Sequence, residues 1–522
     1  MAVEADADPG DGAAGLAAPG GPANVTAARS PERGGATATR AVRDIARAEV
    51  DLVRARLRSL GPGPDERLDR ARYLLSFARL TAFEPGVALG EPVGRRPDVD
   101  LTAELAGFRA QVIAELAAIR RAGADGPDLA TAIGALVERL EEPLAERRAA
   151  VIAGHGADFS AAELDAEVGT RVLVNAAGGG GGAGYVYLGA YQRLDEAGIR
   201  PAYLIGASIG ALMGVFRARH ADPDWAALDA IAKSTDRRTL FTSGTTRRRF
   251  GMPGLLPLRL RKAFGEQFAM PDGEPITLAD LEVPYEAVVA GVRRRPFQRL
   301  PRHFRAEATE PALEDPGARH SPARVTPAIA TRMWQATAFF DPRLVEPVVI
   351  GAEPGTTACR ALDAAGFSAS IPGVLHYDLA PDDDHPGAQA FAALMERREL
   401  AALIDGGMVA NVPAELAWRR VQAGRLGTRN ALVLAFDCFQ PQWDPRHLWL
   451  HPITQAVKIQ LRRNALFADA MVQFTPTLSP ANLVPSAASI DHARGWGRAS
   501  VEPLLPLLRE LLRPIRWSGA SG

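Results

Sequence analysis

The chain has 522 residues, of which 47% are hydrophobic and 23% are charged, and its net charge at pH 7 is −1. This near-neutral balance argues against a general nucleic-acid binder, and two cysteines, Cys359 and Cys438, are too few for a disulfide framework. There is no apolar run of about 18 residues, so we expect no membrane span, and the length predicts two domains and a tail.

The first third of the chain divides into a tail and a helical region. Residues 1–38 lack an apolar core and the pattern of a secretory signal, so we expect a disordered tail and a cytoplasmic protein. Within residues 39–165, apolar side chains recur at helical spacing in three stretches that end at Gly61, Gly123 and Pro143. These patterns predict three or four amphipathic helices that form an all-helical domain without visible chemistry.

A glycine-rich loop follows the first predicted strand of an α/β pattern. The apolar run Arg171–Asn175 leads into Gly178–Gly184, and a helix is predicted from Tyr185 to Glu196. Glycine amides at a helix N-terminus suit the oxyanion that forms when a serine attacks an ester. The alternatives are a flexible linker and a dinucleotide cradle, but a cradle needs an acidic residue after the second strand, where this chain has Gly-Ala-Ser.

The most specific motif is the pentapeptide Gly206-Ala207-Ser208-Ile209-Gly210. It stands between the predicted strand Pro201–Ile205 and the helix-like stretch Ala211–Phe216, so Ser208 lies at the apex of a strand-turn-helix unit. This is the context of a G-x-S-x-G nucleophile, in which glycines allow close approach around a strained serine. An ordinary strand-to-helix turn is the alternative.

Basic residues gather after the pentapeptide, interleaved with large apolar ones. Residues 235–275 are therefore a candidate lid or cap, and residues 237–262 are a candidate for peripheral contact with anionic lipid headgroups. A solvated helix face above ordinary core residues is the alternative. The cations are Arg237, Arg238, Arg247, Arg248, Arg249, Arg259, Arg261 and Lys262.

An acidic turn follows another apolar run further along the chain. The predicted strand Ala401–Ile404 ends in Asp405-Gly406-Gly407. Because ligands bind at the C-terminal ends of strands in open α/β sheets, Asp405 is a candidate base for Ser208, although a turn aspartate is the alternative. Strands at 285–290 and 430–436 alternate with helical stretches, which predicts a mainly parallel sheet, and a helix over 504–512 covers it.

Histidines leave two other kinds of chemistry open. His447, His451 and His492 follow Asp405 in the Ser-Asp-His order of α/β-hydrolases, so a triad is the main enzymatic alternative. A second group of possible ligands lies in a Pro- and Asp-rich stretch that is more typical of an exposed loop than of a metal site. We therefore expect no metal and no cofactor. The members of this group are His376, Asp378, Asp382, Asp383, Asp384 and His385.

Taken together, the motifs resemble those of the patatin-like phospholipase family. Gly181 precedes Gly206 by 25 positions, a close spacing that is typical of this family. The likeness covers roughly residues 170–512 and leaves 513–522 as a tail. The corresponding segments are the oxyanion loop Gly178–Gly184, the serine elbow Gly206–Gly210, the Ala-Ser-x-x-Pro-Gly stretch Ala369–Gly373 and the Asp-Gly-Gly turn Asp405–Gly407, which Asn411-Val412-Pro413 extends.

The resemblance implies a three-layer α/β/α sandwich that hydrolyses acyl esters of lipids through a Ser208–Asp405 dyad. A carboxylate is a poor base for a serine hydroxyl unless burial raises its pKa, so we expect a dry site. Ala183 stands where the family loop usually carries Arg or Lys. This departure keeps two other functions open: a soluble esterase or thioesterase with a triad, and a catalytically weak scaffold that binds acyl chains or a partner. The implied oxyanion hole is Gly179, Gly180, Gly181 and Gly182, and the glycines that shape the motifs are Gly184, Gly206, Gly210, Gly406 and Gly407.

Overall fold

The computed structural model describes residues 33–61, 63, 65–123, 127–241, 249–300, 336–439 and 451–517. The chain divides into two compact units, Met1–Arg40 and Ala41–Gly522. The second unit contains the sheet, the helices that cover it and all predicted site residues. Most of the predicted disordered tail, His447 and the segment 242–248 lie outside the described residues.

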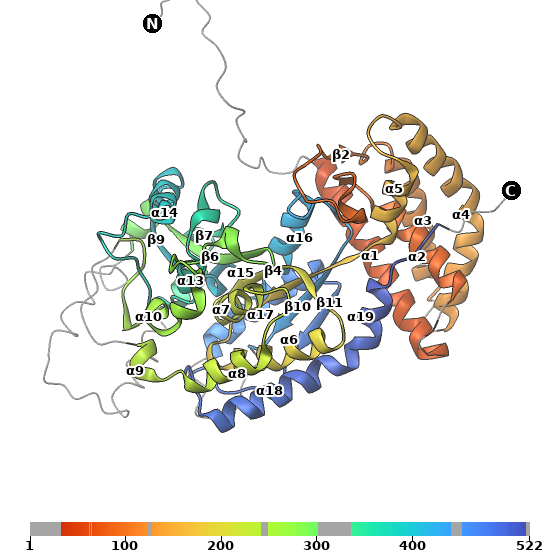
Figure 1. The fold of residues 1–522 in the computed structure, drawn as a ribbon. Helices are drawn as coiled ribbons and strands as arrows, with labels where there is room; N and C mark the ends of the chain where they lie inside the picture. The colour runs from red at the N-terminus through yellow and green to blue at the C-terminus, as the bar shows by residue number, and fades with distance from the viewer. Residues whose placement is uncertain are drawn as a thin grey trace, which may run out of the picture. The chain divides into compact units, whose positions relative to one another are not determined.

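A seven-stranded sheet forms the centre of the second unit (Figure 1). Its strand order is β11-β10-β3-β4-β6-β7, and β9 also pairs with β6. The neighbours from β11 to β6 are parallel, whereas β7 and β9 run antiparallel to β6. The prediction of a mainly parallel sheet is therefore confirmed. The strands are β3 (Val172–Ala177), β4 (Pro201–Ala207), β6 (Tyr285–Arg293), β7 (Val345–Ile350), β9 (Leu400–Asp405), β10 (Ala431–Asp437) and β11 (Ala470–Gln473).

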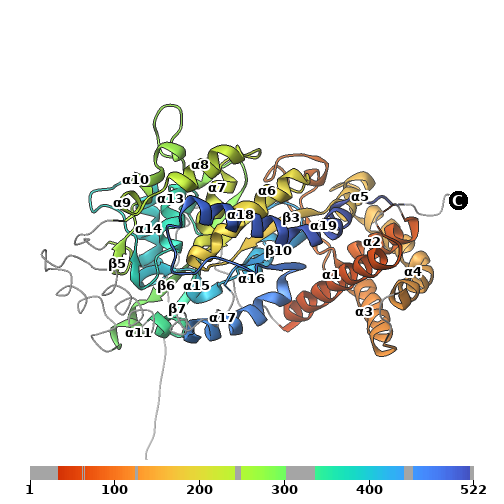
Figure 2. The ribbon, with the colours of Figure 1, turned by 90° about the horizontal axis from the view of Figure 1, so that it is seen from below.

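Helices cover both faces of this sheet, which makes the sandwich three layers thick (Figure 2). Successive strand residues point to opposite faces, so Leu204 and Val289 belong to one core and Tyr203 and Val288 to the other. Both faces are apolar, as expected for a parallel sheet that is buried on each side. One face is covered by α6 (Val186–Glu196), α7 (Ile209–Ala218), α13 (Ala361–Ser368) and α18 (Ala487–Val501), and the other by α15 (Gly407–Ala410), α16 (Ala414–Gln422) and α17 (His451–Asn464).

Helices precede the sheet, as the sequence predicts. The prediction that the third stretch ends at Pro143 is wrong, because α4 continues through Pro143. An interior proline costs a helix about 3 kcal/mol, and the buried residues Leu144 and Val151 beyond it supply packing that offsets this. A short antiparallel pair, β1 (Ala82–Phe83) with β2 (Val99–Asp100), also interrupts the helical region. The helices are α1 (Arg33–Leu60), α2 (Glu66–Arg79), α3 (Ala106–Arg121), α4 (Pro127–Gly154) and α5 (Ala161–Gly169).

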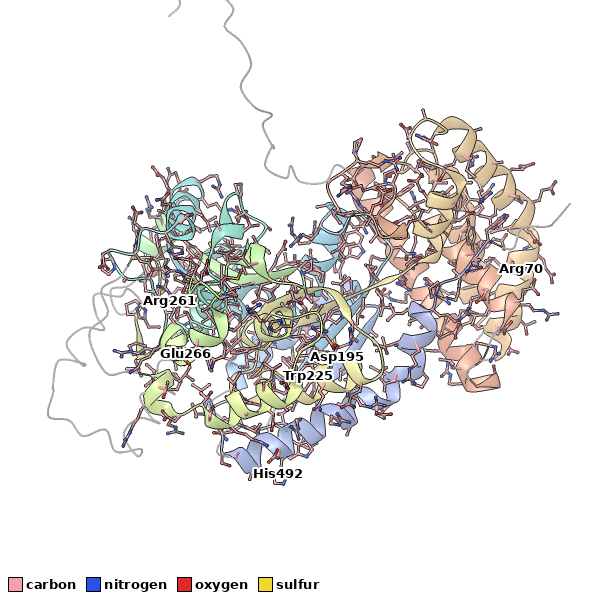
Figure 3. All side chains as sticks on the ribbon, viewed as in Figure 1. Arg70, Asp195, Trp225, Arg261, Glu266 and His492 are labelled. Carbon is pink, nitrogen blue, oxygen red and sulfur yellow. The ribbon has the colours of Figure 1, made fainter. Side chains whose placement is uncertain are left out.

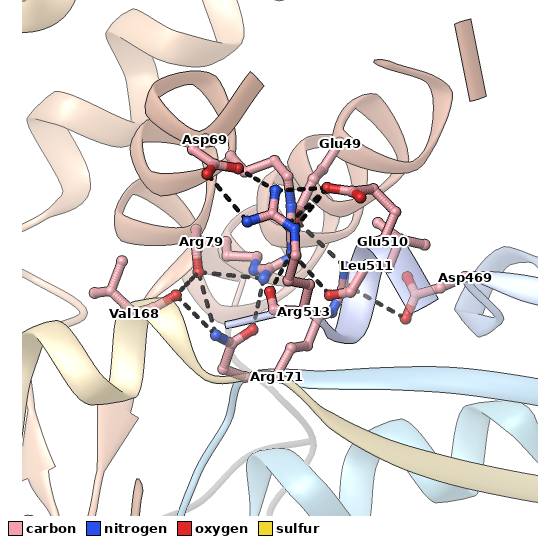
Figure 4. Close-up of polar contacts among 12 residues, drawn as sticks. Glu49, Asp69, Arg79, Val168, Arg171, Asp469, Glu510, Leu511 and Arg513 are labelled. Carbon is pink, nitrogen blue, oxygen red and sulfur yellow. Dashed lines mark hydrogen bonds and ion pairs between the residues drawn. The ribbon is translucent and has the colours of Figure 1, made fainter. Parts of the chain in front are cut away.

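A buried ionic cluster joins α1 and α2 to the N-terminal ends of β3 and β11 (Figure 4). Glu49 of α1 lies 2.6 Å from Arg79, 3.2 Å from Arg171 and 3.3 Å from Arg72. Arg171 directly precedes β3 and also lies 3.4 Å from Asp469, which precedes β11. Burial alone would raise the pKa of Glu49, but Arg79, Arg171 and Arg72 outweigh it and lower the pKa to about 2. These ion pairs thus hold α1 and α2 at the end of the sheet where the parallel strands β3 and β11 begin.

The remaining elements lie at different places around the sheet. Strands β5 and β8 form a two-stranded parallel sheet, and Gly251, three residues before β5, forms a bridge with Leu403 of β9. The last helix, α19, lies beside the ionic cluster, where its Glu510 is 3.5 Å from Arg72. No described helix is both long and apolar enough to cross a bilayer. The bounds are β5 (Gly254–Pro257), β8 (Gly373–His376), α8 (Trp225–Ser234), α9 (Arg237–Leu240), α10 (Leu260–Phe264), α11 (Arg294–Gln298), α14 (Pro386–Arg397) and α19 (Leu505–Leu512).

Candidate active site

Strands β4 and β9 bring the predicted nucleophile and base to the same edge of β6. Ala207 at the end of β4 is opposite Val288, and Asp405 at the end of β9 is opposite Val289. Strand β7 occupies the other edge of β6. Because β4 runs parallel to β6 and β9 runs antiparallel to it, the two C-terminal ends meet head to head. Ser208, the next residue after Ala207, is therefore at this junction with Asp405.

The backbone of Ser208 has the strained conformation that a nucleophile elbow requires. Its φ is +54° and its ψ is −127°, in a region that residues other than glycine rarely occupy. Glycines are needed on both sides because a Cβ on Gly206 would lie 2.5 Å from the backbone nitrogen of Ala211, and one on Gly210 would lie 2.2 Å from the carbonyl oxygen of Ala177. Helix α7 begins immediately after the serine, so its N-terminus points at the junction.

Ser368, the last residue of α13, ties the serine turn to the aspartate turn. Its buried hydroxyl donates to the carbonyl of Val288 at 2.5 Å and accepts the N–H of Ser208 at 3.0 Å. Its carbonyl accepts the N–H of Gly406 at 3.1 Å. One residue therefore ties both strand ends to the edge of β6, through its hydroxyl on the serine side and through its backbone carbonyl on the aspartate side. Ser368 was not among the residues predicted for the site.

Asp405 is buried, and its carboxylate binds a proton more tightly than an exposed aspartate does. Burial raises its pKa to about 7, while the Ser208 hydroxyl and the N–H of Gly407 oppose this rise. The N–H of Gly407 donates to Oδ1 at 2.7 Å, and the N–H of Asp405 itself donates to the carbonyl of Ser370 at 2.9 Å. Among the described residues, no group makes a hydrogen bond of ordinary geometry to Oδ2. The influence of the Ser208 hydroxyl on the pKa of Asp405 nevertheless indicates that this hydroxyl lies beside the carboxylate.

In the glycine loop, two of the four amides that were predicted to bind an oxyanion already donate to backbone carbonyls. The N–H of Gly179 donates to the carbonyl of Asn411 at 2.9 Å, and that of Gly182 donates to a proline carbonyl at 3.0 Å. In the described part of the chain, no acceptor pairs with the N–H of Gly180 or Gly181. Of the four predicted amides, those of Gly180 and Gly181 therefore have no acceptor among the described residues.

Asn411 connects the glycine loop to the aspartate turn and was not among the predicted site residues. A Cβ on Gly179 would lie 2.8 Å from its Oδ1 and 2.9 Å from the Cβ of Ser208, and a Cβ on Gly407 would lie 3.1 Å from the same Oδ1. The glycines therefore allow the loop, the serine and the aspartate turn to pack within van der Waals contact of one another. Gln460 of α17 accepts the N–H of Asn411 at 2.9 Å.

The histidines of the alternative triad lie partly outside the described residues. This is the case for His447 and for the side chain of His451, the first residue of α17. His492 lies on the exposed face of α18 (Figure 3), where its ring stacks on Trp496 with centroids 6.1 Å apart. No described contact links His492 to Ser208 or Asp405.

The expectation of an exposed loop around the second group of candidate ligands is wrong for His376. This residue is buried at the end of β8, which pairs with β5, and its Nδ1 lies 2.6 Å from the carbonyl of Met252. Asp383, a second member of this group, forms ion pairs with Arg261 at 2.6 Å and with Arg360 at 2.7 Å. No group of three or more His, Cys, Asp or Glu residues in the described ranges has the arrangement of a metal site.

The basic segment after the serine presents charge but little apolar surface. Arg237, Arg238, Arg259 and Lys262 are exposed, whereas Arg261 is held by Asp363 and Asp383. Its large apolar side chains belong to the core, since Phe250, Met252, Leu260 and Phe264 are buried. The alternative of core residues beneath solvated cations therefore describes most of this segment.

A three-layer α/β/α sandwich with a strained serine elbow at a strand end is typical of serine hydrolases of the α/β class. Residues 176–418 match the patatin-like phospholipase family. This part of the chain is a patatin-like phospholipase domain, and that family consists of carboxylic ester hydrolases. Among curated proteins, none is significantly similar to the chain. Strands β10 and β11 and helix α18 lie beyond residue 418, so the sandwich extends past the matched segment.

Proposed function

We propose that this protein is a serine lipid acyl hydrolase that cleaves carboxylic esters with Ser208 as nucleophile and Asp405 as base. The observation that carries the proposal is the head-to-head meeting of β4 and β9 on one edge of β6, with a buried carboxylate whose pKa is about 7. At that pKa a large fraction of the carboxylate is ionised at neutral pH, yet it is basic enough to take a hydroxyl proton.

The reaction proceeds in two acyl-transfer steps. Asp405 accepts the proton of the Ser208 hydroxyl while Oγ forms a bond to the ester carbonyl carbon. The carbonyl electrons move to the oxygen, and the N–H groups of Gly180 and Gly181 stabilise that oxyanion. Collapse breaks the ester C–O bond, and the proton on Asp405 passes to the leaving alcohol. Water, deprotonated by the same carboxylate, then releases the fatty acid and restores Ser208.

An acyl chain supplies the low-polarity surroundings that this dyad needs, which favours lipid esters as the substrate class. Ala183, which replaces the family's cation, is buried in the turn between Gly182 and Gly184, so any contact with a phosphate comes from another residue. Peripheral membrane contact through residues 237–262 and a lid function for residues 235–275 stay predictions.

A fluorophosphonate label tests the proposal directly, because it reacts with activated serines. We expect stoichiometric labelling of wild-type Ser208, none in Ser208→Ala, and strongly slowed labelling in Asp405→Asn. Single replacements of His447, His451 and His492 should leave labelling unchanged. Loss of labelling in one of them would establish a triad instead, and an unlabelled but folded wild type would favour the scaffold.

A further inference from the structure

Helix α17 and the turn that follows it carry an exposed stripe with an unusual composition. Ile459 of α17 is 71% exposed. Leu466, in the short 3₁₀ helix Ala465–Phe467 that directly follows α17, is 54% exposed. They are seven positions apart and therefore lie on the same side of the helix, with Arg462 between them. These two are among only five large apolar side chains that are exposed in the described part of the chain. We call Ile459, Arg462, Arg463 and Leu466 the α17 stripe.

The stripe is cationic as well as apolar. Residues 451–467 contain one lysine and two arginines and no Asp or Glu. Arg463 pairs with Glu415 at 2.7 Å, but Arg419 shares the same carboxylate at 2.9 Å, so this local group keeps a net positive charge. Isolated apolar side chains on a surface need no explanation, but two of them on either side of the exposed Arg462, beside a group with a net positive charge, match the surface of an interfacial helix.

The opposite face of α17 is fixed to the aspartate turn. Gln460 accepts the N–H of Asn411 at 2.9 Å and donates to the carbonyl of Met408 at 2.8 Å. Both partners lie within six positions of Asp405. The stripe is therefore separated from the candidate site by one helix thickness, about 10 Å. Figure 2 shows α17 at the outer edge of the sandwich, on the side of the sheet opposite α18.

We propose that the α17 stripe docks this protein on an anionic lipid surface, with Ile459 and Leu466 entering the interface and Arg462 and Arg463 contacting headgroup phosphates. The positive charge selects an anionic membrane over a neutral one. This surface differs from the basic segment 237–262, whose large apolar side chains are mostly in the core. The proposal concerns where the protein meets a membrane and holds whether or not Ser208 is the nucleophile.

Vesicle sedimentation of the full chain tests the proposal in a Ser208→Ala background, in which lipid hydrolysis does not interfere. The probes are vesicles of phosphatidylcholine with phosphatidylglycerol and vesicles of phosphatidylcholine alone. We expect the Ile459→Asn/Leu466→Asn double variant to bind the anionic vesicles about tenfold more weakly, and Arg462→Gln to weaken binding severalfold with a reduced dependence on salt. A matched control is Leu89→Asn/Val93→Asn, which removes two similarly exposed apolar side chains, 60% and 50%, from the segment between β1 and β2. This control should bind like the parent.

A second readout separates insertion from a general loss of stability. An environment-sensitive fluorophore on Ile459→Cys should shift to shorter wavelength when anionic vesicles are added, whereas the same label on Leu89→Cys should not. Equal binding by the parent and the stripe variants, or equal loss in the Leu89/Val93 control, would overturn the proposal. So would a concentration-dependent dimer that the stripe variants abolish without any vesicle binding by the parent, because the stripe would then be covered by a second copy of the chain.

Discussion

The backbone N–H of Ser208 donates to Oγ of Ser368 at 3.0 Å, although 160 positions separate the two residues. The same hydroxyl donates to Val288, and the carbonyl of Ser368 accepts the N–H of Gly406. A residue that makes no contact with the Asp405 carboxylate thus sets the distance between the candidate nucleophile and the candidate base. The elbow is strained, so this hydrogen bond also helps to hold φ of Ser208 at a positive value.

We expect Ser368→Ala to lower kcat about tenfold to a hundredfold with little change in KM, because a small displacement of Ser208 is costly for the chemical step. Activity should be expressed per Ser208 that a fluorophosphonate can label, so that unfolded protein is not counted. Thr356→Val is a matched control: the buried Thr356 hydroxyl also accepts one N–H, from Gly351 at 2.9 Å, and donates to one carbonyl, that of Glu353 at 2.7 Å. Equal loss of kcat in both variants would show that any buried hydroxyl has this effect.

The raised pKa of Asp405 predicts the pH dependence of activity. The base must be ionised to accept a proton, so kcat/KM for a soluble ester should rise about tenfold per pH unit below pH 7 and level off above it. The Ser368→Ala variant keeps the backbone contacts of Asp405 and should show the same midpoint. A midpoint near pH 4, the value of an exposed aspartate, would mean that Asp405 is not the group that titrates.

The parts of this fold that could be predicted are those in which a local pattern has one structural meaning. The strands at 171–175, 201–205 and 430–436 were predictable because strands buried on both faces are apolar throughout. The serine elbow was predictable because glycines flank a serine between a strand and a helix. The antiparallel direction of β7 and β9 was not, since it depends on pairing with β6 across more than 50 positions.

Ser368 shows why the site itself was only partly predictable. A serine at the end of a helix is ordinary in sequence, and only the packing of α13 against β6 directs its hydroxyl to Val288 and Ser208. The same holds for Gln460, whose role depends on α17 packing beside the aspartate turn. The occupied amides of Gly179 and Gly182 could not be foreseen either, because their acceptors lie in distant segments.

A buried carboxylate with a raised pKa should lower the stability of the fold, so Asp405→Asn is expected to stabilise it. The pKa of Asp405 is about 7 in the folded protein and near 3.8 when unfolded, so ionisation at alkaline pH favours unfolding. The difference of about three units corresponds to up to about 4 kcal/mol above pH 7, and it should diminish as the pH falls toward 4. Urea denaturation of the wild type and of Asp405→Asn, at pH 8 and at pH 5, measures how far the variant is stabilised at each pH. Equal stability of the two proteins at pH 8 would mean that Asp405 is well solvated.

Glu49 should have the opposite relation to stability, because its carboxylate compensates three buried guanidinium groups. Its pKa is about 2 in the folded state and near 4.5 when unfolded, so its stabilising contribution is complete above pH 4.5 and is lost as the pH falls through 2. Glu49→Gln leaves Arg72, Arg79 and Arg171 without this partner, and we expect a loss of about 3–5 kcal/mol at pH 7.

The matched control for Glu49→Gln is Glu66→Gln on the neighbouring helix α2, where the carboxylate makes a 2.8 Å pair with Arg70 and is mostly exposed. Exposed pairs contribute less than about 1 kcal/mol, so this variant should unfold at nearly the same urea concentration as the wild type. The two variants remove the same charge, and their difference isolates burial as the cause. Comparable losses would mean that the ionic cluster is hydrated and does not fix α1 and α2 to the sheet. If Glu49→Gln also spares the labelling of Ser208 in the protein that remains folded, the cluster supports the fold without acting on the site at the other end of the strands.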